Sequence, residues 1–347
     1  MKKILFISSA FVFIACGAYK NTNNKEDANV DQASKYATTI TAKDLGTHLF
    51  IYASDEFEGR NTGEPGQKKA VAYLKDFYVK EGIASPLNGD DYFQEVPSAY
   101  LSNNRRGMKL KDSENVVAFI KGSEKPEEII VISAHLDHEG IKNGKIYNGA
   151  DDDGSGTVAI LEIAQAFQKA VKNGKGPKRS ILFLHVTGEE KGLLGSKYYT
   201  ENPIFPLANT VADLNIDMIG RVDDRHKEDP NYIYLIGSDK LSQELHDLSE
   251  EINKKYTNIS LDYKYNDEND PNRFYYRSDH YMFAKHNIPI IFYFNGTHAD
   301  YHQPSDTPDK INYELLEKRT QLVFYTAWEV ANREGRITAA DKLETKN

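Results

Sequence analysis

Residues 149–156 read GADDDGSG and place three aspartates side by side between small residues. Adjacent negative charges repel one another, so a run of this kind indicates that a cation binds there. The spacing from Asp151 to Glu162 satisfies that of an EF-hand calcium loop, with a glycine at its sixth position. The same stretch also fits a different site, in which it supplies one carboxylate to a metal held by several segments of the chain.

The surrounding sequence favours the second interpretation. An EF-hand needs a helix that enters the loop, whereas residues 135–150 are rich in Gly and Asn and show no helical periodicity. The sequence contains no second loop of this type to pair with it, and Glu162 fits the polar face of a helix that starts near Gly156. In a site built from several segments, the small residues let the backbone approach a metal closely.

The elements that must position such a site follow from periodicity. Short continuous apolar runs alternate with segments of helical period such as residues 157–171, which is typical of an α/β fold with a largely parallel central sheet flanked by helices. The predicted strands are 115–120, 128–134, 180–186, 211–217, 232–237 and 288–294. Two further helices are predicted, one after a cap at Thr41 and one before a stop at Gly82.

Residues with metal-ligand chemistry follow four of these strands. Ligands of parallel sheets bind beyond the carboxyl ends of the strands, so polar residues there are candidates for function. They are His135 and Asp137 after the second predicted strand, Glu189 and Glu190 after the third, Asp217 at the end of the fourth, and Tyr301 and His302 after the last. Any one of them alone has an ordinary structural explanation, but four strand ends at one edge of a sheet predict a metal-dependent active site.

Five motifs in this order resemble the zinc aminopeptidase family known as peptidase family M28. They are HLDHEG (135–140), NGADDDGSGT (148–157), GEEKGLLGS (188–196), LNIDMIG (214–220) and DYHQPSDT (300–307), and the resemblance covers roughly residues 55–320. It implies one α/β domain of the zinc-exopeptidase type, over residues 41–337, with two zinc ions. The donor types agree, because His and carboxylate ligands suit catalytic zinc, whereas structural zinc favours cysteines.

The resemblance also implies roles for individual residues. The implied ligand sets are His135, Asp152 and Asp217 for one zinc ion and Asp152, Glu190 and His302 for the other. Asp152 then bridges the two ions with one oxygen to each, and the peptide bond after it is often cis in this family. Glu189 is the implied general base, and Tyr301 is implied to hydrogen-bond the tetrahedral oxyanion.

Asp137 is a further candidate for the catalytic site. It follows His135 by two residues, so its carboxylate is predicted to accept the other imidazole hydrogen of that ligand, which fixes the ring and raises its basicity. No firm role is assigned to Asp151, Asp153, Arg273 or Arg277.

The function that we predict is that of an aminopeptidase. It hydrolyses the N-terminal peptide bond of unblocked peptides with a hydroxide that bridges the two zinc ions, and the carboxylates of the site accept hydrogen bonds from the substrate ammonium group. The aromatic residues 274–276 favour an apolar first side chain. A carboxypeptidase is an alternative, because Arg273 or Arg277 could clamp a substrate carboxylate.

Two more functions on the same scaffold would require a different set of site residues. A glutaminyl cyclase uses a related fold with one zinc and lines its pocket with tryptophans, whereas Tyr301 stands beside His302 here and the only tryptophan, Trp328, lies in the predicted C-terminal helix. A non-catalytic exported binding protein would be expected to have lost Glu189 or a metal ligand, and all of these residues are present.

The two ends of the chain and its charge indicate where the protein acts. Residues 1–15 have the basic start and apolar run of an export signal, and Cys16 directly after them, the only cysteine, resembles the lipidated residue of a bacterial lipoprotein. Residues 16–40 are predicted to be a flexible tether, and residues 338–347 a polar tail. The protein is thus expected to face the periplasm or cell exterior from a lipid anchor. A formal net charge of −9 without long basic runs argues against a nucleic-acid partner.

Overall fold

The computed structural model describes Met1 and residues 31–340. The predicted signal peptide, Cys16 and most of the predicted tether lie outside the described residues, as does the end of the predicted tail. The packed chain begins with α1 (Gln32–Ala37), in which Tyr36 is buried and stacks on Trp328. The boundary that we predicted at residue 41 therefore falls inside the packed part, because the apolar residues of this short helix follow a long polar stretch and are too few to show a period.

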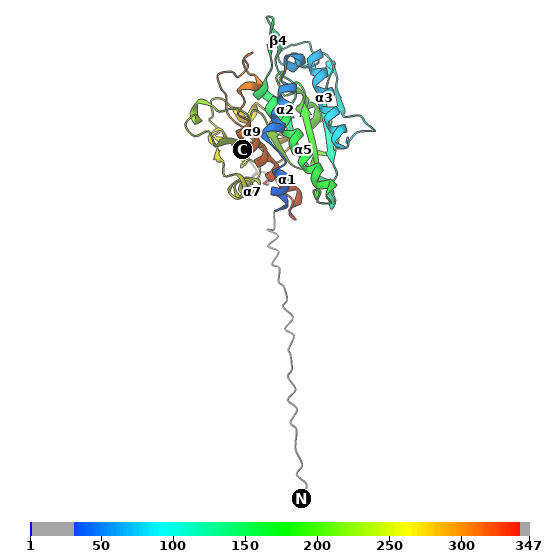
Figure 1. Cartoon of the computed structure of the whole chain (residues 1–347). Helices are drawn as coiled ribbons and strands as arrows, with labels where there is room; N and C mark the ends of the chain where they lie inside the picture. The colour runs from blue at the N-terminus through cyan, green and yellow to red at the C-terminus, as the bar shows by residue number, and fades with distance from the viewer. Residues whose placement is uncertain (2–30, 341–347) are drawn as a thin grey trace, which may run out of the picture. The chain divides into compact units, whose positions relative to one another are not determined.

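Eight strands in the described part of the chain form one mixed sheet (Figure 1). Their order is β1 (Phe93–Val96), β2 (Ser113–Ile120), β6 (Arg179–Val186), β3 (Lys125–His135), β7 (Thr210–Ile216), β10 (Ile290–Phe294), β8 (Tyr232–Ile236) and β9 (Ser260–Asp262). The four central strands, β6, β3, β7 and β10, are parallel, whereas β1, β2 and β8 each pair antiparallel with a neighbour. All six predicted strands are present, and the α/β fold with a largely parallel centre is confirmed.

Some short strands were missed because three or four residues are too few to show a period. Besides β1 and β9, they include the hairpin of β4 (Gly140–Lys142) and β5 (Lys145–Tyr147), which projects from the domain at the top of Figure 1. This hairpin lies in the chain between His135 and the aspartate run.

Helices cover both faces of the central strands. The helices are α2 (Ala42–Tyr52), α3 (Pro65–Glu81), α4 (Ser98–Leu101), α5 (Gly156–Lys172), α6 (Leu194–Glu201), α7 (Gln243–Ile252), α8 (His280–Ala284) and α9 (Tyr313–Asn332), after α1. On β3, Ile130 and Ile132 belong to the core beneath α2, α5 and α9, whereas Ile129 and Val131 belong to the core on the opposite face, with Phe283 of α8. Both faces are apolar, which explains the continuous apolar runs in the sequence.

The predicted helix ends are confirmed at two places. The Thr41 hydroxyl accepts a hydrogen bond from the amide of Asp44 at the start of α2, and Gly82 ends α3 in the left-handed conformation that favours glycine. Within residues 31–340, every helix is too short or too polar to cross a bilayer.

Candidate metal centre

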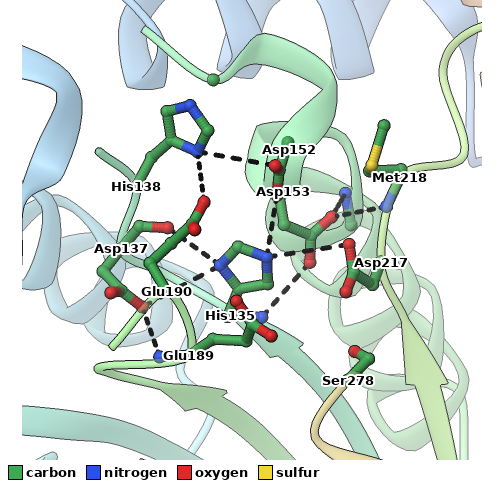
Figure 2. A network of polar contacts seen from close by, with 12 residues as sticks. His135, Asp137, His138, Asp152, Asp153, Glu189, Glu190, Asp217, Met218 and Ser278 are labelled. Atoms are coloured by element: carbon green, nitrogen blue, oxygen red, sulfur yellow. Dashed lines mark hydrogen bonds and ion pairs between the residues drawn. The ribbon is translucent and has the colours of Figure 1, made fainter. Parts of the chain in front are cut away.

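The parallel strands bring the candidate ligands to one edge of the sheet. β3 ends at His135, Glu189 and Glu190 follow β6, and Asp217 follows β7. Because these strands are parallel neighbours, their carboxyl ends lie side by side, and the side chains converge on a common pocket (Figure 2). The turn that carries the three aspartates packs over the same edge, just before α5.

One group of ligand atoms surrounds the Nε2 atom of His135. This nitrogen lies 3.1 Å from Oδ1 of Asp152 and 3.7 Å from Oδ1 of Asp217. All three side chains are almost completely buried, and their ligand atoms lie within 4.8 Å of one another. Three convergent donors of this kind are the usual protein contribution to a catalytic zinc position.

A second group lies on the other side of Asp152. The Nε2 atom of His302 is 3.0 Å from Oδ2 of Asp152 and 3.3 Å from Oε1 of Glu190. Asp152 therefore presents one carboxylate oxygen to each group, as a ligand that bridges two ions must. The peptide bond between Asp152 and Asp153 is cis, as the family resemblance implied.

The hydrogen bonding of the pocket fits a bound cation. Within the described residues, His135 Nε2, Asp152 Oδ2 and Glu190 Oε1 are buried and have no hydrogen-bond partner. Buried polar atoms are almost always paired, because an unpaired one costs about 1–3 kcal/mol. Imidazole nitrogens and carboxylate oxygens are the donors that Zn²⁺ accepts, so two zinc ions would satisfy all three atoms.

The pKa shifts describe what holds the pocket together in the metal-free protein. Burial by itself lowers the pKa of His302, but the carboxylates of Asp152 and Glu190 beside it outweigh this effect and raise the pKa to about 10. Burial by itself raises the pKa of Asp152, but the surrounding histidines, His138 first, hold it well below its usual range. A metal that binds beside His302 must therefore displace a proton from that imidazole.

Glu189 and Tyr301 line the cleft beside the two groups. The cleft is lined by Asp152, Glu189, Asp217, Met218, Phe274, Arg277, Phe292, Phe294, Tyr301 and His302. Burial raises the pKa of Glu189 well above its usual value, which brings this carboxyl closer to the range in which it can both accept and return a proton. Burial also raises the pKa of Tyr301, so its hydroxyl keeps its proton and can donate a hydrogen bond.

The predicted contact of Asp137 is wrong in one respect. His135 Nδ1 lies 2.9 Å from the backbone carbonyl of Asp137, whereas the Asp137 carboxylate is 3.9 Å away. That carboxylate instead accepts hydrogen bonds from the hydroxyl of Thr62, at 2.7 Å, and from the amide of Glu189, at 3.1 Å. The main chain satisfies the imidazole because only one residue separates it from Asp137, and the carboxylate is left to position the segment that carries Glu189.

The other two members of the aspartate run have structural roles that the sequence left open. Asp153 accepts hydrogen bonds from the amides of His135, Gly156 and Met218 and so ties the ends of β3 and β7 to the start of α5. Asp151 accepts from the amide of Gly220 and the hydroxyl of Ser155, and it also faces Nε2 of His298 at 3.1 Å. Only the middle aspartate faces both metal positions.

Sequence reasoning missed two buried residues, one that supports the segments of the site and one that faces its ligands. Arg60 is completely buried, and it donates hydrogen bonds to the carbonyl groups of Tyr52, Leu136, Asn148 and Gly149. Its sequence context is a loop without period, so nothing indicated burial. His138 lies against Asp152 and Glu190, and its signal was the second histidine of HLDHEG, three residues after His135.

The calcium loop is not formed. Glu162, which would be its last ligand, is buried in α5 and its carboxylate lies 3.5 Å from Nε2 of His48.

The comparisons with known proteins agree with this geometry. The family model described as peptidase family M28 matches residues 115–327, well over half of the chain. Leupeptin-inactivating enzyme 1 of Streptomyces exfoliatus is 26% identical over 305 residues, which is 81% of this chain. The chain spans 59% of the length of that enzyme and less than a third of the next three curated relatives.

Solved structures share the fold at low sequence identity. The LapA aminopeptidase of Legionella pneumophila has a TM-score of 0.65 at 21% identity and covers 87% of this chain and 75% of its own. The glutaminyl cyclase of Porphyromonas gingivalis has a TM-score of 0.65 at 18% identity and covers 83% of this chain and 98% of its own. Because two different activities occur on this fold, the activity must be argued from the residues of the site.

Proposed function

The chain belongs to peptidase family M28, and from that premise we propose that it is a dinuclear zinc aminopeptidase, which removes one residue from the N-terminus of unblocked peptides. The observation that carries the proposal is the position of Asp152, whose two oxygens face His135 and His302 respectively. A carboxylate placed in this way would be shared by two metal ions, as in two-metal hydrolases. When bound, the ions would act as Lewis acids on the scissile carbonyl and lower the pKa of water.

The residues of the chain then divide the remaining work. Glu189 accepts a proton from the attacking water and later delivers it to the leaving amine, for which its raised pKa is suited. Tyr301 donates a hydrogen bond to the oxygen on which negative charge develops. Asp137 holds the Glu189 amide and so acts as a positioning residue rather than in the chemical step.

The walls of the cleft favour an apolar first residue in the substrate. Phe274, Phe292 and Phe294 form one aromatic cluster together with Met218, and all four line the cleft. Such a surface binds an apolar side chain by excluding water, at about 25 cal/mol per Å² of buried area. The substrate ammonium group would then lie toward the carboxylates of Asp152 and Asp217, as an aminopeptidase requires.

Arg277 is the observation that favours the runner-up, a carboxypeptidase. It lines the cleft, stacks on Phe274, and its guanidinium donates a hydrogen bond to the Tyr301 hydroxyl at 3.1 Å. Arg273, in contrast, stacks on Tyr276 in a separate hollow. A guanidinium beside the oxyanion donor could hold a substrate carboxylate, so the test must compare the two substrate ends.

The deciding assay compares a leucine-initiated peptide with its N-acetylated and C-amidated twins. We expect acetylation to stop hydrolysis and amidation to leave it unchanged. The reverse pattern would establish the carboxypeptidase instead. A peptide with N-terminal glutamine tests for glutaminyl cyclase activity. We expect none, because such enzymes line their pocket with tryptophans, whereas Trp328 packs against Tyr36 and Phe167 in the helical layer.

We also propose that the mature protein is anchored by a lipid on Cys16 and acts outside the cytoplasm. The support is the sequence alone, in which a short apolar run ends directly before this only cysteine. Replacing Cys16 with Ser should abolish acylation and release the protein from membranes. Native protein that is cleaved at another residue and is freely soluble would refute this proposal.

A further inference from the structure

His138 lies beside the proposed metal ligands, although no role was predicted for it from the sequence. It is completely buried, and its Nδ1 atom is 2.9 Å from Oε1 of Glu190 and 3.8 Å from Oδ2 of Asp152 (Figure 2). His302 reaches the same two oxygens with Nε2, at 3.3 and 3.0 Å. Two imidazole nitrogens and two carboxylate oxygens therefore converge on one point.

The hydrogen bonds of the fold do not explain His138. Within the described residues, neither of its ring nitrogens makes a hydrogen bond of good geometry, and Nδ1 has only its ion-pair contacts with the carboxylates of Glu190 and Asp152. The two other histidines that are completely buried each use a ring nitrogen: His185 contacts the Tyr78 hydroxyl at 2.6 Å, and His280 contacts the Tyr275 carbonyl at 2.9 Å. A buried histidine without such a partner needs another reason to be there.

The chain makes room for this ring. A Cβ atom at Gly149 would collide with Cγ of His138, so only glycine fits there, and its φ of 54° is also one that favours glycine. The amide of His138 donates to the carbonyl of Arg60, which fixes the backbone. Nearby Glu139 is ion-paired with Lys142 and Lys191 and is therefore less available as a ligand than His138.

We propose that His138 is a fourth protein ligand of the second zinc position, through Nδ1. This inference rests on the proposed dinuclear function. The second position then has two imidazoles and two carboxylates, whereas the first has one imidazole, from His135, and two carboxylates, from Asp152 and Asp217. Four donors are a complete tetrahedral set for zinc, and three leave a position open. The second position should therefore bind the first equivalent of zinc and keep it longest, while the first position exchanges its ion.

The test is a zinc titration of the metal-free full chain against a competing chromophoric chelator. Wild type should show two binding steps, with the tighter one assigned to the second position. His138→Gln should weaken the tighter step by at least the roughly 10–100-fold that loss of an outer-shell partner costs, and leave the other step unchanged. His185→Gln is the matched control: it also removes a buried histidine, but its ring contacts Tyr78 and both zinc steps should remain.

X-ray absorption gives a readout that does not depend on activity. With one equivalent of zinc, wild type should show two imidazoles per ion and His138→Gln one. Unchanged affinities and an unchanged imidazole count in His138→Gln would overturn the inference and leave the dinuclear proposal standing. Wild type that binds fewer than two zinc ions would instead refute the proposed function.

A second variant keeps the test decisive if His138→Gln does not fold. In a Cys16→Ser background, His138→Cys introduces a single thiol at the proposed ligand position. With one equivalent of Co²⁺, we expect a thiolate-to-cobalt charge-transfer band, because a metal deprotonates a coordinating thiol. Absence of the band in folded, cobalt-loaded protein would also overturn the inference.

Discussion

The two ends of strand β6 bury charge in opposite ways. At its amino end, Arg179 is fully buried and its guanidinium is satisfied by the carboxylate of Glu128 and by three carbonyl groups at the end of α9 and just beyond it. Beyond its carboxyl end, Oε1 of Glu190 is buried without a hydrogen-bond partner in the described structure, as is His135 Nε2 on the neighbouring strand.

Arg179 is a buried charge whose partners all belong to the fold, whereas Glu190 and His135 are buried polar groups that, in the described part of the chain, lack a partner until a ligand binds. A buried charge with all its partners is compatible with the folded state, and removal of either partner is costly. Buried groups without partners reduce the stability of the metal-free protein and become favourable only when a cation arrives.

The largest expected effect is that of removing the metal. Chelation of the purified protein should abolish peptide hydrolysis, and zinc, but not calcium, should restore it. Elemental analysis should find close to two zinc ions per chain before chelation. Stoichiometric calcium together with activity that survives a zinc chelator would contradict a zinc site at the carboxyl end of β6.

Substitution of the adjacent glutamates should separate chemistry from metal binding. Glu189→Gln keeps the shape but removes the base, so turnover should fall by about 10²–10⁴ while both zinc ions stay bound. Glu190→Gln should lose zinc as well, because its Oε1 faces His302 at 3.3 Å. Near-normal turnover of Glu189→Gln would show that another group is the base.

At the opposite end of β6, Arg179→Met should change stability alone. We expect the free energy of unfolding to fall by about 3 kcal/mol, since the Glu128 carboxylate and the carbonyl groups near α9 lose a buried partner. Zinc content and turnover should be unchanged, because the eight-residue strand separates the two ends by about 25 Å. Urea unfolding and zinc analysis of the same preparation check this, and a loss of zinc would mean that the two ends are coupled.

The smallest effect is a difference in pH dependence between two buried groups, His185 and Asp279, the latter a carboxyl that accepts a hydrogen bond from the Ser196 hydroxyl. Burial lowers the pKa of His185, within β6, to about 3, so its contribution to stability is present above pH 6.5 and is lost as the pH falls toward 3. Burial raises the pKa of Asp279 to about 7, so its contribution is present below pH 3.8 and is lost as the pH rises toward 7. Each slope is at most about 1.4 kcal/mol per pH unit.

Two variants show which residue causes each pH dependence in the metal-free protein. When the free energy of unfolding is measured between pH 4 and 8, the dependence due to His185 should be absent from His185→Gln, and that due to Asp279 should be absent from Asp279→Asn. Slopes of the same sign in both variants would contradict the contrast between His185 and Asp279.

The sequence predicted the central strands well because each of them is covered on both faces. The continuous apolar run at 128–134 has no other good explanation, and its polar neighbours then fall at the sheet edge. The helix Gln32–Ala37 and the hairpin after Gly140 were missed because their length gives no period to read.

The sequence predicted those parts of the site in which the residue type alone defines the chemistry. It missed those in which the role of a residue depends on its position in the folded chain. The resemblance suggested Asp152 as the bridge, but nothing in three identical residues distinguishes it from Asp151 and Asp153, whose roles depend on which amides surround them. The contact of Asp137 was wrong because the nearer acceptor is its own carbonyl group. Burial of Arg60 and His138 depends on segments that meet only in the folded chain.

Asp306 links two segments that are far apart in the chain. Its carboxylate accepts hydrogen bonds from the amides of Asp151 and Asp152, and it lies in the same loop as His302. The loop and the aspartate turn are thus joined without any ion, so the conformational entropy of bringing these ligands together is lost during folding rather than during metal uptake. Zinc should therefore bind to ligands that are already in place, at a rate set by diffusion and by the loss of the proton from His302, with no slow phase for loop ordering.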